Sequence, residues 1–155
     1  METFSTRLLV LILSGVSILC AADPILGTWT LNLHESRYYP GPAPKSQVRV
    51  YGTSDEGTMV TVTTVNAEDE TVKTIFPGIY DGRDYPITGA SEYDTIAMHR
   101  IDDYTAEATH KHAGMNIAIS RRVVAPDGKT MTITVKSADP QRTSVDITSV
   151  YDRKE

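Results

Sequence analysis

Two histidines are spaced so that their side chains could act together on a ligand. His110 and His112 are two residues apart in an alternating stretch, so on a strand they would share one face. A neutral imidazole can bind a metal ion or serve as a general acid and base. His99, the nearest third ligand, falls on the opposite parity of its own segment. We therefore expect no metal site and no cofactor, and we take His110 as a candidate ligand contact.

Arginines follow two apolar runs at the parity expected to face a protein interior. Arg121 continues the series Met115, Ile117 and Ile119, and Arg100 follows a similar pair in an earlier segment. A buried guanidinium cannot lose its charge, so it needs a carboxylate, backbone carbonyls or an anionic ligand. Arg121 is therefore the leading ligand-binding candidate, with Arg100 behind it. The alternative is an arginine at a strand end that reaches water or pairs with an acidic residue.

The last alternating segment places further polar groups on its inner parity. Tyr151 and Arg153 follow Val145 and Ile147 on that parity. Both are added to the ligand-binding candidates.

Sequence motifs for catalysis are absent. There is no glycine-rich phosphate loop, no His-Glu-x-x-His, no Gly-x-Ser-x-Gly and no calcium-loop spacing. No pairing of a nucleophile with a base is evident from the spacing. We therefore predict no catalytic residue, and an enzyme using His110 or Arg121 with Tyr151 is the weakest of the functional hypotheses.

The net charge of the chain argues against binding to polyanionic partners. The 155 residues carry 15 Lys and Arg against 20 Asp and Glu, for a formal net charge of −5. Such a chain has no basic surface for nucleic acid or for an anionic membrane. The length allows one globular domain.

The amino-terminal segment predicts export. An apolar run of about a dozen residues (8–19) follows Arg7, and it is shorter than the roughly twenty residues of a spanning helix. Small residues follow it, so we expect a signal peptide over 1–22, cleaved after Ala22, and a secreted or periplasmic domain over 23–155. Lipidation at Cys20 is the alternative, but Leu19 and Ser17 do not fit the lipoprotein pattern. Cys20 is the only cysteine, so no disulfide is expected after cleavage.

The amino-acid composition of the rest of the chain favours β-strands. Thr, Val and Ile make up 45 of the 155 residues, and β-branched side chains favour a pleated surface over a helix. Alternation and short turns predict antiparallel strands over 25–33, 45–51, 58–65, 71–76, 85–88, 93–101, 104–112, 115–125, 130–137 and 145–151. Residues 34–44 contain Pro40, Pro42 and Pro44 and are expected to be irregular. We predict an all-β fold, an antiparallel up-and-down barrel of about 8–10 strands, with a β-sandwich as the alternative. The more apolar parity of each strand is expected to face the interior, which places Leu33, Val48 and Val50 there.

The opening strand carries a short family motif. Gly27-Thr28-Trp29 on the first strand of an exported β-meander resembles the lipocalin and fatty-acid-binding barrels. The resemblance implies that Trp29 closes one end of the barrel, and Trp29 is therefore also a ligand-binding candidate. It further implies that an arginine of the last strand packs on this tryptophan. That arginine would be Arg153, with Arg142 as the less favoured choice. Fatty-acid-binding barrels also hold a carboxylate with an arginine and a tyrosine two apart, a spacing that Tyr151 and Arg153 share in reversed order.

Longer segments are similar to a group of uncharacterised secreted bacterial proteins. The similar segments are residues 27–32, 36–46, 80–86, 100–102 and 127–132. This similarity implies a lipocalin-like domain of the envelope or the extracellular space and brings no activity with it.

These expectations lead to one main functional hypothesis. The chain is expected to be a secreted lipocalin-like domain, a monomer, that binds a small hydrophobic or amphipathic ligand inside its barrel. The alternative is a filled barrel that acts as a structural or interaction domain through its loops, since small barrels can be filled or hollow.

Overall fold

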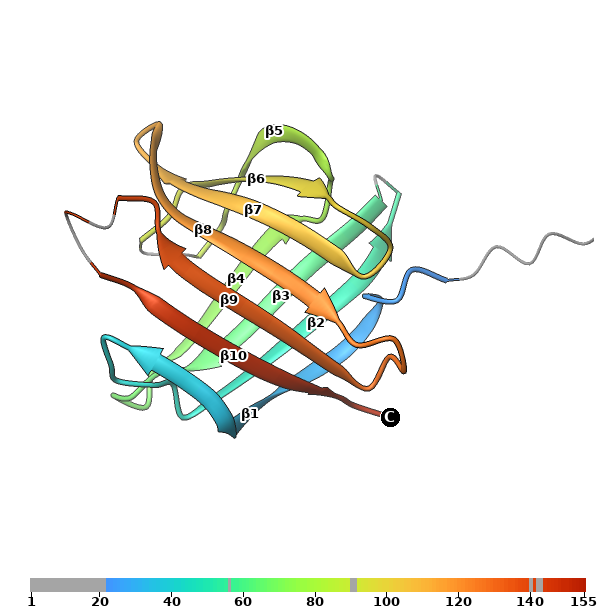
Figure 1. Cartoon of the computed structure of the whole chain (residues 1–155), viewed down its shortest axis with the longest axis horizontal. Coiled ribbons are helices and arrows are strands. Elements are labelled where there is room, and N and C mark those ends of the chain that lie inside the picture. Colours follow the sequence, from blue (N-terminus) through green and yellow to red (C-terminus); the bar gives the residue numbers. More distant parts are fainter. Residues whose placement is uncertain (1–21, 56, 90–91, 140, 142–143) are drawn as a thin grey trace, which may run out of the picture.

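Ten antiparallel strands form a single sheet that curls into a nearly closed barrel (Figure 1). The computed structural model describes residues 22–155 except 56, 90–91, 140 and 142–143. The predicted antiparallel barrel is confirmed. The predicted leader with its Cys20, and Arg142, lie outside the described residues. The strands are β1 (Gly27–Tyr39), β2 (Ser46–Ser54), β3 (Gly57–Val65), β4 (Thr71–Pro77), β5 (Asp81–Pro86), β6 (Thr95–Arg100), β7 (Thr105–His112), β8 (Met115–Val124), β9 (Thr130–Ser137) and β10 (Asp146–Arg153).

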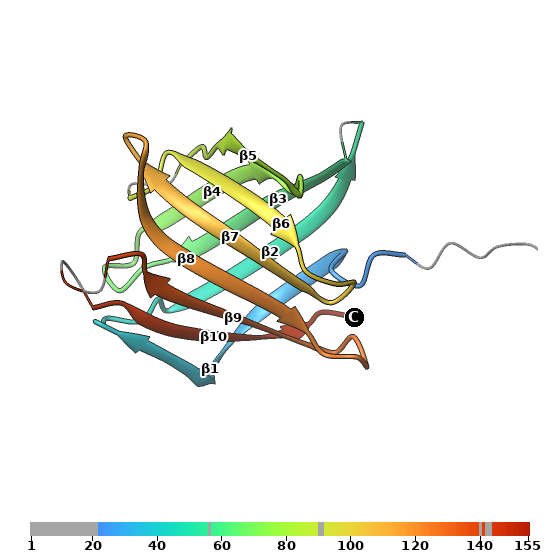
Figure 2. The ribbon, with the colours of Figure 1, turned by 45° about the horizontal axis from the view of Figure 1, so that its top comes forward.

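The strand order is that of a meander closed through its first and last members. The sheet runs β4-β3-β2-β1-β10-β9-β8-β7-β6-β5, so β1 pairs with both β2 and β10. The two ends of the sheet, β4 and β5, lie next to each other (Figure 2), and in the described residues an isolated bridge joins Ile75 of β4 to Thr88, which follows β5. We call this place the seam of the barrel.

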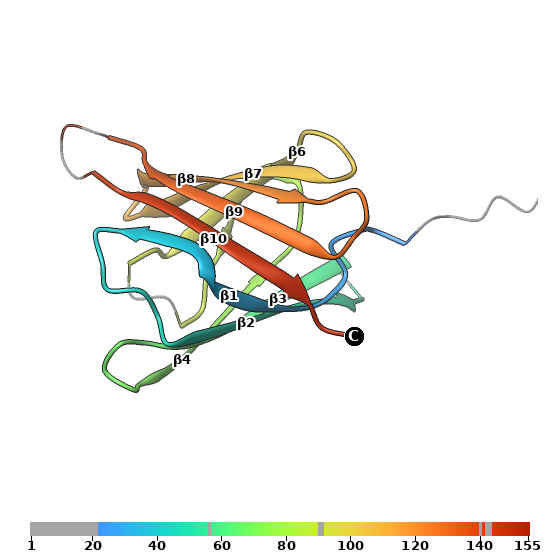
Figure 3. The ribbon, with the colours of Figure 1, turned by 60° about the horizontal axis from the view of Figure 1, so that its bottom comes forward.

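β1 is longer and more irregular than its sequence predicts. Its first part pairs with β2 and β10, and its last part, Arg37 to Tyr39, pairs with β10 alone (Figure 3). Between Asn32 and Arg37 the register with β10 shifts, so the four residues in between form a large bulge. The expected irregular stretch over 34–44 was therefore wrong in its first half. The predicted inward position of Leu33 was also wrong, because the bulge leaves this side chain 42% exposed.

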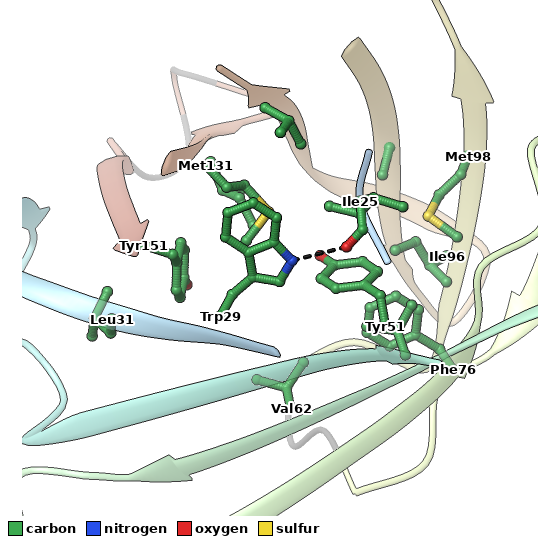
Figure 4. Packing of buried hydrophobic residues seen from close by; sticks show 14 residues of the cluster. Ile25, Trp29, Leu31, Tyr51, Val62, Phe76, Ile96, Met98, Met131 and Tyr151 are labelled. Carbon is green, nitrogen blue, oxygen red and sulfur yellow. Dashed lines mark hydrogen bonds between the residues drawn. The ribbon is translucent and has the colours of Figure 1, made fainter. Parts of the chain in front are cut away.

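The core lies at one end of the barrel around the single tryptophan (Figure 4). Trp29 is fully buried, and its indole N–H donates to the carbonyl of Ile25 at 2.8 Å. The buried apolar side chains around it come from β1 to β4, β6 to β10 and the segment before β1, and they are Ile25, Leu31, Tyr51, Val60, Val62, Phe76, Ile96, Met98, Ala108, Val124, Met131, Ile133 and Tyr151. Several of these side chains, among them Ile96, Met98 and Ile133, also border a hollow part of the interior.

Candidate functional site

The barrel encloses a cavity of about 410 Å³. This volume lies in the range of small-molecule sites. Its walls are mostly apolar, and the apolar side chains come from five strands and the segment after β5: they are Val62, Val72, Phe76, Ile87, Ile96, Met98, Ala106, Ile133 and Val135. Polar side chains also line it, namely Gln47, Arg49, Tyr51, Thr64, Thr74, Glu92, Tyr93, Glu107, His110, Ser120 and Arg122. Val72 is 38% exposed and Glu92 is also exposed, so the mouth lies on their side.

Arg49 enters the cavity from β2. It pairs in register with Trp29 of β1 and Val62 of β3, and cross-strand partners project to the same face of a sheet, here the interior. Its Nε donates to the Tyr51 hydroxyl at 3.3 Å, and its guanidinium carbon lies 5.7 Å from the centre of the Tyr151 ring. Burial acts against the charged form, but Tyr51 and Tyr151 outweigh it and hold the pKa of Arg49 above its ordinary value. Arg49 is therefore a permanent cation inside the barrel.

Arg122 enters from the opposite wall on β8. It pairs with the buried Ile133 of β9 and is itself only 9% exposed. Its Nη1 donates to the Tyr80 hydroxyl at 2.8 Å, while its Nε is buried and has no hydrogen-bond partner in the described part of the chain. Its guanidinium carbon lies 5.4 Å from the centres of both the Tyr51 and Tyr80 rings. A second fixed cation therefore faces the cavity with an unused donor.

Tyr51 stands between the two guanidiniums. Burial favours its neutral phenol, but the charges of Arg49 and Arg122 outweigh burial and lower its pKa. Within the described part of the chain neither arginine forms an ion pair; the ion pairs there belong to other cations. Asp23, which acts on Arg122 at longer range, is engaged by Arg100 and by the backbone N–H of Ile25. Arg49 and Arg122 thus bring positive charge to the cavity, and no carboxylate of the described residues lies within ion-pair distance of either guanidinium.

His110 lines the cavity from β7, as the sequence suggested. Its Nε2 lies 2.8 Å from the Ser120 hydroxyl, and its ring stacks at a tilt on Tyr93 with centroids 4.9 Å apart. Burial, and then the charge of Arg49, lower its pKa to about 4. The imidazole is therefore neutral at neutral pH. Its Nδ1 is buried without a partner among the described residues, so no carboxylate orients the ring as in a catalytic triad.

Three predicted site residues form the closed end rather than the cavity wall. The Arg153 guanidinium lies 4.2 Å from the centre of the Trp29 ring, which is the contact that the family resemblance implied for the pair. Its three nitrogens donate to the backbone carbonyls of Gly128, Leu26 and Pro24. Tyr151 is buried beside them, and its hydroxyl donates to Oε1 of Gln47, a cavity residue, at 2.5 Å. Arg153 is thus satisfied by backbone, whereas Tyr151 supports the cavity floor from behind.

The predicted inward position of Arg121 was wrong. Its side chain is 51% exposed and donates to Glu107 at 2.8 Å. The reason is a bulge in β8, where Asn116 pairs with Lys111 but Ala118 pairs with His110, so that Ile117 is an extra residue. The extra residue inverts the parity of everything after it, and Ile119 is accordingly 48% exposed.

Arg100 has the predicted inner parity but lies at the end of β6, outside the cavity lining. Its guanidinium pairs with Asp23 and lies 4.4 Å from the centre of the Tyr80 ring. Tyr80 is also the residue whose hydroxyl accepts the hydrogen bond from Arg122. Arg100 therefore stabilises the wall behind the cavity.

Sequence reasoning missed Arg49, Tyr51, Ser120 and Arg122. On β2 the apolar parity is that of Val48 and Val50, and the inward assignment of these valines was wrong, since Val50 is 40% exposed. The polar parity is the buried one there, and hydrophobic alternation cannot identify such a strand. Arg121 and Arg122 are adjacent, so one of them must face the interior and the other the solvent. Only the bulge in β8 decides that Arg122 is the inner one.

Comparisons with known proteins add no family to this description: no family model matches the chain, and no curated protein matches it. In the described residues no helix is long and apolar enough to cross a membrane. No group of three or more His, Cys, Asp or Glu side chains within the same residues is arranged to hold a metal ion.

Proposed function

We propose that the protein is a secreted lipocalin-like carrier that binds a small hydrophobic or amphipathic ligand inside its barrel. The observation that supports this most directly is the cavity of about 410 Å³ with its mostly apolar wall. An apolar ligand that enters such a space leaves water and gains dispersion contacts, and a few polar groups fix its orientation.

The alternative of a filled barrel that acts only through its loops predicts a different interior. Side chains would occupy the space between Ile96, Ile133 and Val135, whereas here these residues face a cavity. The cavity therefore favours ligand binding over the filled-barrel hypothesis.

Uptake of a neutral apolar fluorophore tests the proposal. The delipidated protein is titrated with N-phenyl-1-naphthylamine, and we expect saturable fluorescence enhancement at micromolar concentrations. Val135→Trp, which fills the cavity, should abolish the enhancement. Val123→Trp places the same ring on the outer face, where Val123 is 39% exposed, and should leave uptake unchanged. The absence of saturable uptake by the wild-type protein, or equal uptake by Val135→Trp, would contradict the proposal.

A further inference from the structure

We propose that the ligand of this cavity carries an anionic head group, and that Arg49 and Arg122 bind this group together across the barrel. The inference rests on the proposed function and names the chemical class of the ligand. It is carried by the two cations that face one cavity from opposite walls.

The first argument is electrostatic. A guanidinium keeps its charge when it is buried, and burial of a charge is costly unless a counter-charge or several hydrogen bonds accompany it. Arg121, Arg100 and Arg153 each obtain such partners, from a carboxylate or from three backbone carbonyls. Arg49 and Arg122 have only tyrosine hydroxyls as hydrogen-bond acceptors among the described residues. The two cavity arginines are thus the ones that lack compensation.

The second argument is the direction of the free donors. The Nε of Arg122 is buried and unpaired, while Nη1 is engaged by Tyr80. The Nε of Arg49 makes only a long contact of 3.3 Å, to the hydroxyl of Tyr51. An anionic oxygen placed beside Tyr51 could accept from both sides. Hydrogen bonds between a guanidinium and an oxyanion are short and about twice as strong as neutral ones.

The third argument concerns what else lines the cavity. His110 is neutral at neutral pH, so it adds a hydrogen-bonding group without a charge. Two carboxylates also line the cavity: Glu107 is paired with Arg121 of the outer face, and Glu92 is exposed at the mouth. The rest of the wall away from the arginines is mostly apolar, through side chains such as Ile96, Met98 and Val135. One charged end and one apolar body describe an amphipathic anion, and the same positive end would repel an amphipathic cation.

A matched ligand series separates this inference from the proposed function. Dodecanoate, dodecyl phosphate, dodecanol and dodecylamine share one chain and differ in the head group, and each is tested for displacement of N-phenyl-1-naphthylamine. We expect one or both anions to bind at least tenfold more tightly than the alcohol, and the amine to bind most weakly. The ranking of dodecanoate against dodecyl phosphate identifies the head group. If the alcohol binds as well as both anions, the cavity binds ligands but the anion inference is wrong. If none of the four displaces the probe and the probe itself does not bind, the proposed function is wrong as well.

Single substitutions test whether the preference for an anionic head group depends on Arg49 and Arg122. Arg49→Met and Arg122→Met keep an unbranched apolar stem and remove the guanidinium with its charge, and each should reduce the preference for the anion over the alcohol at least fivefold while alcohol binding persists. Arg121→Met is the matched control, since it removes the neighbouring arginine from the outer face. A preference that survives in the Arg49→Met, Arg122→Met double variant overturns the inference.

A spectroscopic measurement on the protein with both Arg49 and Arg122 intact tests the inference even if the arginine variants do not fold. Tyr51 lies between the two guanidiniums, so an anion bound there should favour its neutral phenol and move the pH midpoint of tyrosine ionisation upward. The shift, followed by ultraviolet absorbance, should appear with dodecanoate or dodecyl phosphate, be absent with dodecanol, and disappear in Tyr51→Phe. No shift with a bound anion would contradict contact at this place.

Discussion

His110 shows how one buried side chain in the cavity wall ties stability to pH. The imidazole hydrogen bonds to Ser120, lies against Tyr93 and is close enough to feel the charge of Arg49. Protonation would add a second charge beside that guanidinium in a poorly hydrated space. The pKa of His110 is lowered from 6.5 to about 4 for this reason.

The sign of the resulting pH dependence follows from proton counting. Between pH 6.5 and about 4 the unfolded chain binds a proton at His110 and the folded chain does not, so the free energy of unfolding falls as the pH decreases through this window. Relative to His110→Gln, the wild-type protein should lose on the order of 3 kcal/mol between pH 7 and pH 4. Urea unfolding of both proteins across this range measures the difference.

The exposed histidine on the same strand is the control for this prediction. His112 lies at the end of β7 with its side chain 56% exposed. His112→Gln should therefore follow the wild-type pH profile. Parallel profiles for His110→Gln and the wild-type protein would show that the imidazole at position 110 is not buried as described.

At the scale of elements, two bulges decide which residues reach the interior. The bulge in β8 turns Arg122 inward, and the larger bulge in β1 ends the predicted alternation after Asn32. The β1 bulge would break the hydrogen-bonding ladder with β10, but Ser36 replaces part of it. The Ser36 hydroxyl donates to the carbonyl of Asn32 at 2.7 Å and accepts from the backbone N–H of Val150 at 2.9 Å.

Removal of this hydroxyl should destabilise the pairing of β1 with β10. Ser36→Ala leaves the N–H of Val150 without its acceptor, and an unsatisfied amide in a partly buried place costs about 1 to 3 kcal/mol. Chemical denaturation should show this loss, and amide exchange should accelerate at Val150. Ser46→Ala, at the exposed first residue of β2, is the control and should change stability by less than about 0.5 kcal/mol. Equal stability of the two variants would exclude a role for Ser36 in the ladder.

At the scale of the whole molecule, the barrel depends on a single weak closure. Most neighbouring strands share long ladders, whereas at the seam the described residues show two hydrogen bonds, each of 2.9 Å, between Ile75 of β4 and Thr88, which follows β5. Gly89 follows the bridge with a φ of +83°, and a Cβ there would lie 1.9 Å from the carbonyl oxygen of Lys73. The seam therefore closes only because a glycine lets two backbones approach.

A methyl group at Gly89 should open the barrel at this place. Gly89→Ala is expected to lower the free energy of unfolding by several kcal/mol and to accelerate amide exchange at Ile75 and Thr88, since the clash is with backbone. Gly82→Ala is the matched control: its φ of +78° is similar, but nothing lies within 4 Å of the added Cβ. It should cost only the left-handed conformation, about 1 to 2 kcal/mol. Equal losses in both variants would show that the approach at the seam does not limit closure.

Several features of the molecule could be predicted from local sequence because they depend on local chemistry. β-branched composition and alternation predicted ten strands and the barrel, and the polar group His110 on an alternating strand was placed correctly in the wall. Trp29 and Arg153 were paired from a short motif, and they do stack. In each case the residue and its near neighbours were sufficient.

The rest was decided by register, which local sequence specifies poorly. A bulge of one residue in β8 turns Arg122 rather than Arg121 toward the interior. On β2 the valines face outward and the polar side chains face inward, so hydrophobic alternation did not identify Arg49 and Tyr51 as cavity residues. Side chains alternate with a period of two, so one extra residue exchanges the two faces of a strand, and only pairing with the neighbouring strands selects the face. The sequence by itself determined that this chain forms antiparallel strands, with a barrel or a sandwich as the possible arrangements. The tertiary structure selected the barrel and decided which charges face the cavity, because burial of a guanidinium depends on partners brought from β2, β8 and the segment before β5.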